Sequence, residues 1–224
     1  MRLVAFGCSN TFGKALPDVW DYEKNKEQPF NQGPSKYAWP QLLADKLNVE
    51  CINNGIPGAS NKEIWWNIIN YNFQKNDIVF VLWSSLNRTC IIEEDDLNSI
   101  GNWEQKHKIF FTTYHNNFDQ YIQFFLYCNY VHYFLQNKVK LLKHLVPVFM
   151  SRALCAPSSF FKFKDGYGKI LTNDPLVNFE KTKLLYDKKA MDKIHSGLEA
   201  HNTFAEEIYN EIKNENTEKL NRKQ

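Results

Sequence analysis

Three side chains near the two ends of the chain are of the types that nucleophilic catalysis requires. Ser9 follows a short apolar run near the N-terminus, while Asp192 and His195 stand close together near the C-terminus. A serine hydroxyl becomes an effective nucleophile when an imidazole takes its proton, and a carboxylate can fix the tautomer of that imidazole. Because an aspartate three residues before a histidine can reach the same ring from one loop, these residues predict a catalytic triad.

Such a serine also needs hydrogen-bond donors for the negative oxygen of a tetrahedral intermediate. Turns that contain glycine expose backbone amides without a Cβ in the way. The amides of Ser9 and Gly58, together with a side chain near Asn87, are the candidate donors. The chemistry that these residues predict is acyl transfer at a carbonyl carbon.

Segments with strand-like patterns must bring these residues together. Residues 2–6 are apolar, residues 49–53 alternate, and residues 78–83 form a nearly continuous apolar run. A continuous run is typical of a strand buried on both faces of a parallel sheet, so we expect this strand to be central. Residues 145–150 predict another strand, which Pro147 would place toward a sheet edge or bulge.

Helical patterns separate these strands. Pro40 can occupy the first turn of one helix, and capping boxes over residues 60–63 and 196–199 predict the starts of two more. Residues 114–136 contain no Pro or Gly and carry aromatic side chains at helical spacing, which predicts a long amphipathic helix. Alternating strands and helices predict an α/β fold with a parallel sheet covered on both faces.

In such folds, ligands bind at the carboxyl ends of the strands. Three polar segments follow predicted strands, at residues 7–13, 53–60 and 84–88. A loop before the last helix can bring His195 back across the same edge of the sheet. We therefore expect the nucleophile, the donors and the base to meet there.

The order and content of these segments resemble a known family. Residues 6–13 resemble the first block of SGNH/GDSL hydrolases, residues 53–58 resemble the second, and the sequence from Asp192 to His195 matches the D-x-x-H of the last. The resemblance covers residues 1–90 and 190–212. It implies a three-layer α/β/α flavodoxin-like sandwich and a serine ester hydrolase that works through an acyl-enzyme. The expected substrate is an acyl or O-acetyl ester of a carbohydrate or small molecule, with no metal or other cofactor.

The family also implies three oxyanion donors, which correspond to the amides of Ser9 and Gly58 and to a third-block asparagine, here Asn87. Two departures stand out. Cys8 replaces the usual aspartate before the serine, and the third block reads Trp83-Ser84-Ser85-Leu86-Asn87-Arg88 instead of Gly-x-Asn-Asp. Ser84 or Ser85 is therefore an alternative donor.

Charge and cysteine usage narrow the class of partner. The formal net charge of +2 is too small to predict a nucleic-acid partner. The acidic run Glu93-Glu94-Asp95-Asp96 could hold a cation, but we expect a solvated loop and no metal. Five scattered cysteines without a C-x-x-C pair predict reduced thiols. Because neither a signal peptide nor a membrane span is evident, the expected location is the cytoplasm.

The same features predict one SGNH hydrolase-like domain over residues 1–212. Within it, residues 88–137 are interpreted as a variable, aromatic-rich helical insertion, and residues 213–224 as a polar C-terminal tail that frays. His201 is expected to be a packing or surface residue. The oligomeric state is left open.

Two alternative functions are weighed. Residues 7–14 resemble the G-x-x-x-x-G-K of a phosphate-binding P-loop, with one residue more between the two glycines. Ala15 lacks the hydroxyl that would bind Mg²⁺, and Pro17 interrupts the helix that should follow. The altered third block is compatible with a non-catalytic binding or structural protein that has kept the fold. The ester hydrolase is the preferred hypothesis.

Overall fold

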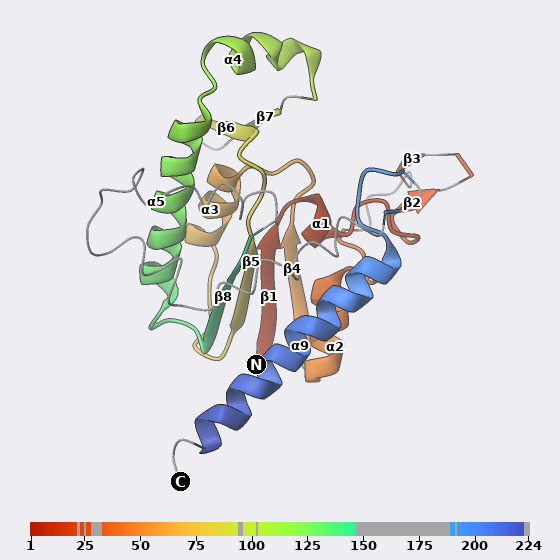
Figure 1. Ribbon diagram of the computed structural model, residues 1–224, viewed down its shortest axis with the longest axis vertical. Helices are drawn as coiled ribbons and strands as arrows, with labels where there is room; N and C mark the ends of the chain where they lie inside the picture. Colours follow the sequence, from red (N-terminus) through yellow and green to blue (C-terminus); the bar gives the residue numbers. More distant parts are fainter. Residues whose placement is uncertain are drawn as a thin grey trace.

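The computed structural model describes residues 1–21, 23–24, 26–27, 33–93, 96–101, 103–146, 189–190 and 192–221 (Figure 1). Some expectations concern residues outside these ranges. They are the strand candidate from Pro147 onward, the two middle residues of the acidic run, Glu94 and Asp95, and the thiol of Cys155.

Four parallel strands form the central sheet, in the order β4-β1-β5-β8 (Figure 1). They are β1 (Arg2–Gly7), β4 (Glu50–Gly55), β5 (Ile78–Leu82) and β8 (Leu141–Leu145). The central place predicted for residues 78–83 is confirmed, because β5 pairs with β1 on one side and β8 on the other. The second strand of the sheet along the chain lies outside the first, as in flavodoxin-like folds.

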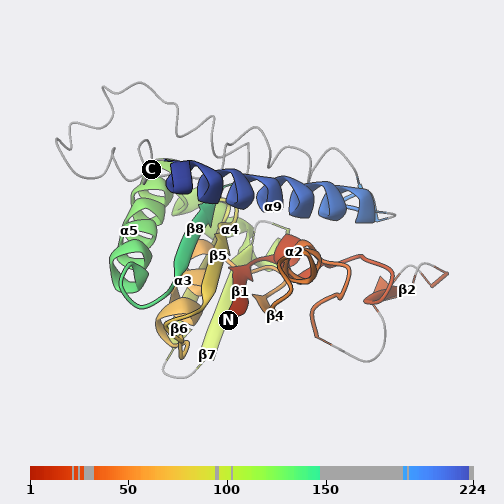
Figure 2. The same ribbon diagram turned by 90° about the horizontal axis from the view of Figure 1, so that it is seen from below.

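Helices cover both faces of this sheet (Figure 1, Figure 2). One face carries α2 (Trp39–Leu47) and α9 (Leu198–Asn221), which pack against each other. The other face carries α3 (Asn61–Ile69) and α5 (Asn117–Leu135). The three-layer α/β/α sandwich expected from the sequence is therefore confirmed.

Alternation along β1 shows how one strand serves two layers of core. Val4 and Phe6 pack with the helices α3 and α5, while Leu3 and Ala5 pack with α2 and α9. All four side chains are buried. Successive side chains of a strand point to opposite faces, so a strand buried on both faces needs the continuous apolar run that this segment has.

Smaller elements lie outside the sandwich. They are α1 (Ser9–Phe12), the two-stranded ribbon of β2 (Trp20–Asp21) and β3 (Lys26–Glu27), the antiparallel hairpin of β6 (Arg88–Glu93) and β7 (Asp96–Gly101), η1 (Gln105–His107) and α4 (Lys108–Thr113). Figure 1 shows the hairpin and α4 extending beyond the end of the sheet where α1 lies.

The hairpin qualifies the helical insertion expected over residues 88–137. The first part of this segment consists of strands, and only the part that contains α4 and α5 is helical. The β-branched residues Thr89, Ile91 and Ile92 favour strand over helix, which accounts for the difference.

Two other boundaries differ from the prediction. The strand expected over residues 145–150 begins earlier, as β8 from Leu141. The sequence did not indicate this start, because Lys143 and His144 interrupt the apolar pattern although both are buried. Helix α9 continues to Asn221, through the tail expected to fray from Lys213. Residues 213–221 contain neither Pro nor Gly and include Glu and Lys, which favour helix.

The first capping box is half formed. The Ser60 Oγ accepts a hydrogen bond from the amide of Glu63 at 3.2 Å, as predicted. The Glu63 carboxylate accepts from the Ser99 hydroxyl at 2.8 Å, instead of returning to the serine amide. Through this contact, the start of α3 holds the β6–β7 hairpin near the end of the sheet.

Candidate active site

Three strand ends meet at one edge of the sheet. Gly7, the last residue of β1, pairs with Gly55 at the end of β4 and with the last residue of β5. Ser9 begins α1 directly after β1, while Gly58 follows β4 and Ser84 follows β5. Because β1 lies between the other two strands, the predicted nucleophile stands between the segments that contain the predicted donors.

Asn53 in β4 fastens α1 to the sheet. Its Nδ2 donates to the carbonyl oxygen of Thr11 at 2.7 Å, and its Oδ1 accepts from the amide of Gly55 at 2.9 Å. A side chain at Gly55 would not fit, since a Cβ there would lie 2.3 Å from the backbone nitrogen of Phe12. These contacts fix the short helix that carries Ser9.

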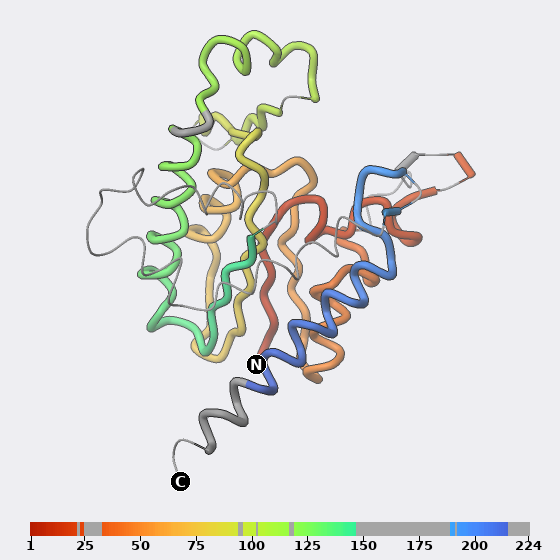
Figure 3. The backbone as a smooth tube through the Cα atoms, in the orientation of Figure 1, coloured from red at the N-terminus to blue at the C-terminus, as the bar shows by residue number. Residues whose placement is uncertain are grey.

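The loop before α9, part of the blue trace in Figure 3, carries Asp192 and His195. The amide of Ala190 donates to the carbonyl oxygen of His195 at 2.8 Å, which closes the loop on itself. Within it, Nδ1 of His195 lies 2.5 Å from Oδ2 of Asp192. The other carboxylate oxygen accepts from the amides of Ile194 and His195, both at 3.0 Å. The contact expected from the D-x-x-H spacing is therefore present.

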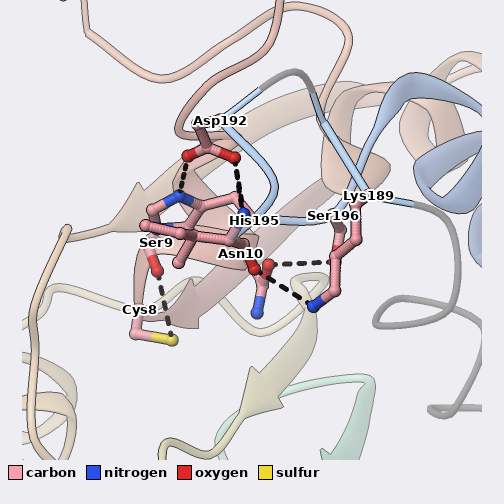
Figure 4. Close-up of polar contacts among 8 residues, drawn as sticks. Cys8, Ser9, Asn10, Lys189, Asp192, His195 and Ser196 are labelled. Carbon is pink, nitrogen blue, oxygen red and sulfur yellow. Dashed lines mark hydrogen bonds and ion pairs between the residues drawn. The ribbon is translucent and has the colours of Figure 1, made fainter.

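A hydrogen bond joins this loop to α1. The buried Ser196 hydroxyl donates to Oδ1 of Asn10 at 3.1 Å. Since these residues directly follow His195 and Ser9, the bond holds the predicted base and nucleophile near each other, and Figure 4 draws them together. No sequence motif predicted this contact between Ser196 and Asn10; their places next to the predicted triad were the available signal.

No hydrogen bond joins Ser9 to His195 in the part of the chain that the structure describes. The Ser9 Oγ lies 4.0 Å from Sγ of Cys8, and Figure 4 marks this contact with a dashed line. Hydrogen bonds between a nucleophile and its base are often long without substrate and tighten when substrate binds.

The Asp192 carboxylate controls the state of the His195 ring. Burial acts to raise the pKa of Asp192, but hydrogen bonds from the His195 ring and from the amides of His195 and Ile194 outweigh it and lower that pKa below its ordinary value. An ionised carboxylate can only accept hydrogen bonds, so the proton of the neutral ring lies on Nδ1. The basic nitrogen that remains is Nε2, as a general base requires.

Two backbone amides at this edge are available as donors. Ser9 is the first residue of α1, so its amide has no acceptor within the helix. Gly58 adopts a φ of 87° in the turn after β4. Neither amide donates a hydrogen bond to another residue among those described. Both candidate donors are therefore free to bind an oxygen of a ligand.

The third polar segment is held by Asn61. Its Nδ2 donates to the carbonyl oxygen of Ser84 at 3.1 Å, and its Oδ1 accepts from the Ser84 amide at 2.7 Å. The Ser85 Oγ accepts from the amide of Asn87 at 3.2 Å, and Asn87 itself is exposed. The structure thus fixes Ser84 firmly beside the end of β5 and leaves the Asn87 side chain at the surface. The sequence predicts for Asn61 only a place within a capping box.

The P-loop interpretation does not fit the geometry after β1. A phosphate-binding loop leads into a helix that continues past its lysine. Here α1 ends at Phe12, and the chain turns through Gly13 and Ala15, which have φ values of 81° and 66°.

Metal-binding side chains and thiols were also expected from the sequence to play no part in the site. Among the described residues, no three His, Cys, Asp or Glu side chains form a group that could hold a metal ion. Glu93 is the last residue of β6 and pairs with Asp96, the first residue of β7; both are exposed. The four described cysteines, at positions 8, 51, 90 and 128, are free thiols.

Among the helices in the described ranges, none is both long enough and apolar enough to cross a bilayer.

Comparisons with known proteins give matches in structure only. No protein-family model matches the sequence, and a search of curated proteins finds no match either. A catalytic mutant of Axe2, an acetylxylan esterase from Geobacillus stearothermophilus, is similar with a TM-score of 0.53 and 18% identity; the match covers 94% of this chain and 93% of that chain.

Two further solved structures show the same arrangement. Est2A, an acetyl xylan esterase from the rumen bacterium Butyrivibrio proteoclasticus, matches with a TM-score of 0.51 and 12% identity over 96% of this chain, which spans only 63% of that protein. LAE5, an alpha/beta hydrolase enzyme from the metagenome of Lake Arreo, Spain, matches with a TM-score of 0.50 and 18% identity over 92% of each chain. At these identities the likeness concerns the fold. The chain therefore shares the three-layer α/β/α fold of these solved hydrolases, which is the fold that the resemblance of its sequence motifs implied.

Proposed function

We propose that this protein is a serine ester hydrolase with Ser9 as nucleophile, His195 as general base and Asp192 as the carboxylate that orients the base. The observation that carries the proposal is the Asp192–His195 pair, held beside the start of α1 by the bond from Ser196 to Asn10. The fold, which the chain shares with solved esterases, supports the same reaction class.

The reaction has two steps. In the first, Nε2 of His195 takes the Ser9 proton as Oγ attacks the carbonyl carbon of the ester; the ring then gives this proton to the departing alcohol as the C–O bond breaks. In the second, the same nitrogen takes a proton from water as the water oxygen attacks the acyl-enzyme. The proton returns to Ser9 Oγ when the acid leaves.

The oxyanion that forms in each step needs donors in place beforehand. The free amides of Ser9 and Gly58 suit this role. For the third donor, the hydroxyl of Ser84 or Ser85 is better supported than the exposed side chain of Asn87. Ser84 is buried and clamped by Asn61, so its position costs no ordering during the reaction.

The proposed substrate is an O-acetyl or other short acyl ester of a carbohydrate or small alcohol. Two of the structural neighbours are acetyl xylan esterases, which supports this choice. The reaction as written uses only this chain's residues and water.

The decisive test measures hydrolysis of 4-nitrophenyl acetate, 4-nitrophenyl octanoate and acetylated xylo-oligosaccharides by the pure protein and by two variants. We expect turnover to be lost in Ser9→Ala and retained in Cys8→Ala. A fluorophosphonate should add covalently to Ser9, as peptide mass spectrometry would show. The reverse pattern of variants would assign the nucleophile to Cys8, and no turnover of any ester would favour a binding protein with this fold.

A further inference from the structure

Arg88 and Trp103 form a pair at the base of the β6–β7 hairpin, close to the proposed active site. Arg88 is the first residue of β6, and Trp103 lies just beyond the end of β7. The guanidinium carbon of Arg88 lies 5.0 Å from the centroid of the Trp103 ring. A guanidinium at this distance from an indole is attracted by the electrons of the ring, so the contact orients both side chains.

The hairpin is built to hold the tryptophan in this place. Gly101 pairs with Arg88 across the two strands. A Cβ at Gly101 would come within 2.0–2.2 Å of three carbons of the Trp103 ring. The absence of a side chain at Gly101 therefore lets the ring fold back over β7 and lie beside Arg88.

This pair touches two loops of the proposed oxyanion site. The Nη1 of Arg88 donates to the Ser84 hydroxyl at 3.2 Å, and the Ser84 backbone is clamped by Asn61. On the other side, Cζ2 of Trp103 lies 3.7 Å from where a Cβ of Gly58 would be. A ligand whose carbonyl oxygen reached the Gly58 amide would therefore lie next to the tryptophan ring and the guanidinium.

The guanidinium has unused binding capacity. It carries five N–H donors, and the hydroxyl of Ser84 is its hydrogen-bond acceptor among the described residues. No described carboxylate lies within ion-pair distance of Arg88, whose side chain is half-buried. Trp103 is 53% exposed, so a large part of its ring is open to a ligand.

From this arrangement we propose that Arg88 and Trp103 form a subsite for an ester whose sugar or other ring carries a negatively charged group. The proposal rests on the proposed hydrolase function. A guanidinium matches carboxylate and phosphate with two parallel hydrogen bonds, and the indole offers an apolar surface to the ring that bears the anion. The substrate class is thus an O-acylated acidic sugar, with the anion a carboxylate or a phosphate.

The test compares substrates that differ only in charge. We would measure kcat/KM for O-acetylated glucuronic acid and for O-acetylated glucuronamide, with 4-nitrophenyl acetate as a reference ester that lacks a sugar ring. The wild-type protein should prefer the acid by about tenfold or more, because hydrogen bonds to a charged group are stronger than those to a neutral one. In Arg88→Gln this ratio should fall to about one.

Lys75→Gln is the matched control, because it removes one positive charge at an exposed site in the loop before β5, at the opposite edge of the sheet. It should keep the wild-type ratio. Acetylated glucose 6-phosphate provides a third arm: a higher kcat/KM than for the glucuronate would identify phosphate as the preferred anion.

Two results would overturn the subsite and leave the hydrolase intact: equal kcat/KM for the acid and the amide in the wild-type protein, or an unchanged preference in Arg88→Gln. Failure of the hydrolase itself would appear as no turnover of any ester, including 4-nitrophenyl acetate. Calorimetric titration of the Ser9→Ala protein with glucuronic acid and with glucuronamide tests the subsite without catalysis. Tighter binding of the acid supports the proposal, and equal or absent binding contradicts it.

Discussion

The loop before α9 and the first turns of α9 each contain a histidine, and the two histidines have opposite kinds of partner. His195 in the loop faces a carboxylate, since its Nδ1 lies 2.5 Å from Asp192. His201 in the helix faces a donor, because its Nδ1 accepts the amide of Trp39 at 3.0 Å. The His195 side chain keeps 18% of its surface exposed, whereas His201 is fully buried.

The partner determines which protonation state the site favours. Burial lowers the pKa of His201 to about 3, and the nearby His195 acts in the same direction. His144 repeats this environment: it accepts from the Trp83 indole at 3.1 Å, and burial together with His132 lowers its pKa to about 3. A ring that accepts from a fixed N–H through Nδ1 must stay neutral. Nδ1 of His195 faces an acceptor instead, which leaves Nε2 as the basic nitrogen. The comparison therefore favours His195 as the base. It gives the buried rings of His201 and His144 structural roles.

The largest effect should come from removing the His195 ring, whose partner is the Asp192 carboxylate. His195→Ala should lower kcat for 4-nitrophenyl acetate by about a thousandfold or more, because the serine loses its proton acceptor. The His195 side chain is partly exposed and lies in a loop, so the free energy of unfolding should change by less than about 1 kcal/mol. Steady-state kinetics and urea unfolding check both statements. A variant that kept a tenth of the wild-type kcat would refute the assignment of the base.

The second largest effect on kcat should come from changing Asp192, the partner of His195. Asp192→Asn can still accept from the amides of Ile194 and His195, so the loop should keep its shape. The variant loses the negative charge that stabilises the protonated ring and can favour the wrong tautomer. We expect kcat to fall by about a hundredfold or more at neutral pH, with little change in KM. A fall in stability without a fall in kcat would instead make Asp192 a loop-closing residue.

The same region shows how far the sequence could lead. The D-x-x-H spacing predicted the contact of Asp192 with His195, and the continuous apolar run predicted the central strand β5. Both inferences rest on local pattern, since the partners are close in sequence or the pattern repeats within one element. The roles of Ser9, Gly58 and the third-block residues remain proposals.

Contacts between distant segments could not be predicted in this way. The bond from Ser196 to Asn10 and the clamp of Asn61 on Ser84 join loops that only the fold brings together. A polar residue inside the core also made the prediction of β8 wrong. His144 interrupts the apolar run of this strand, although it is buried and its Nδ1 accepts a hydrogen bond from the Trp83 indole. The hairpin over residues 88–101 was missed because the aromatic side chains that follow it suggested helix.

A smaller effect should appear in the pH dependence of stability. Above pH 6.5, the His201 and His144 rings are neutral in both the folded and the unfolded chain. Below it, the unfolded chain binds protons that the folded protein excludes until about pH 3. The free energy of unfolding should therefore fall with decreasing pH, by up to about 1.4 kcal/mol per pH unit for each ring.

Urea unfolding at several pH values between 7 and 5 measures this slope. His201→Gln keeps a side-chain acceptor near the Trp39 amide but cannot titrate, so its slope should be smaller than that of the wild-type protein. An unchanged slope would mean that His201 is protonated in the folded state as readily as in the unfolded one. The contrast with His195 would then lose its basis.

The smallest effect should follow from loosening the connection between the loop that carries His195 and the helix α1 that carries Ser9. Ser196→Ala removes the hydroxyl that donates to Asn10, at a buried position where no large side chain is lost. One such bond contributes about 1 kcal/mol, so kcat should fall by about three- to tenfold while KM for a small ester hardly changes. Ser196→Thr, which keeps a hydroxyl, should recover part of the loss. Ser99→Ala is the matched control, because it removes a hydroxyl that donates to Glu63 in the first turn of α3, instead of one that donates to α1. If both alanine variants lowered stability equally and neither changed kcat, the bond would serve the fold alone, and the placement of His195 beside Ser9 would need another cause.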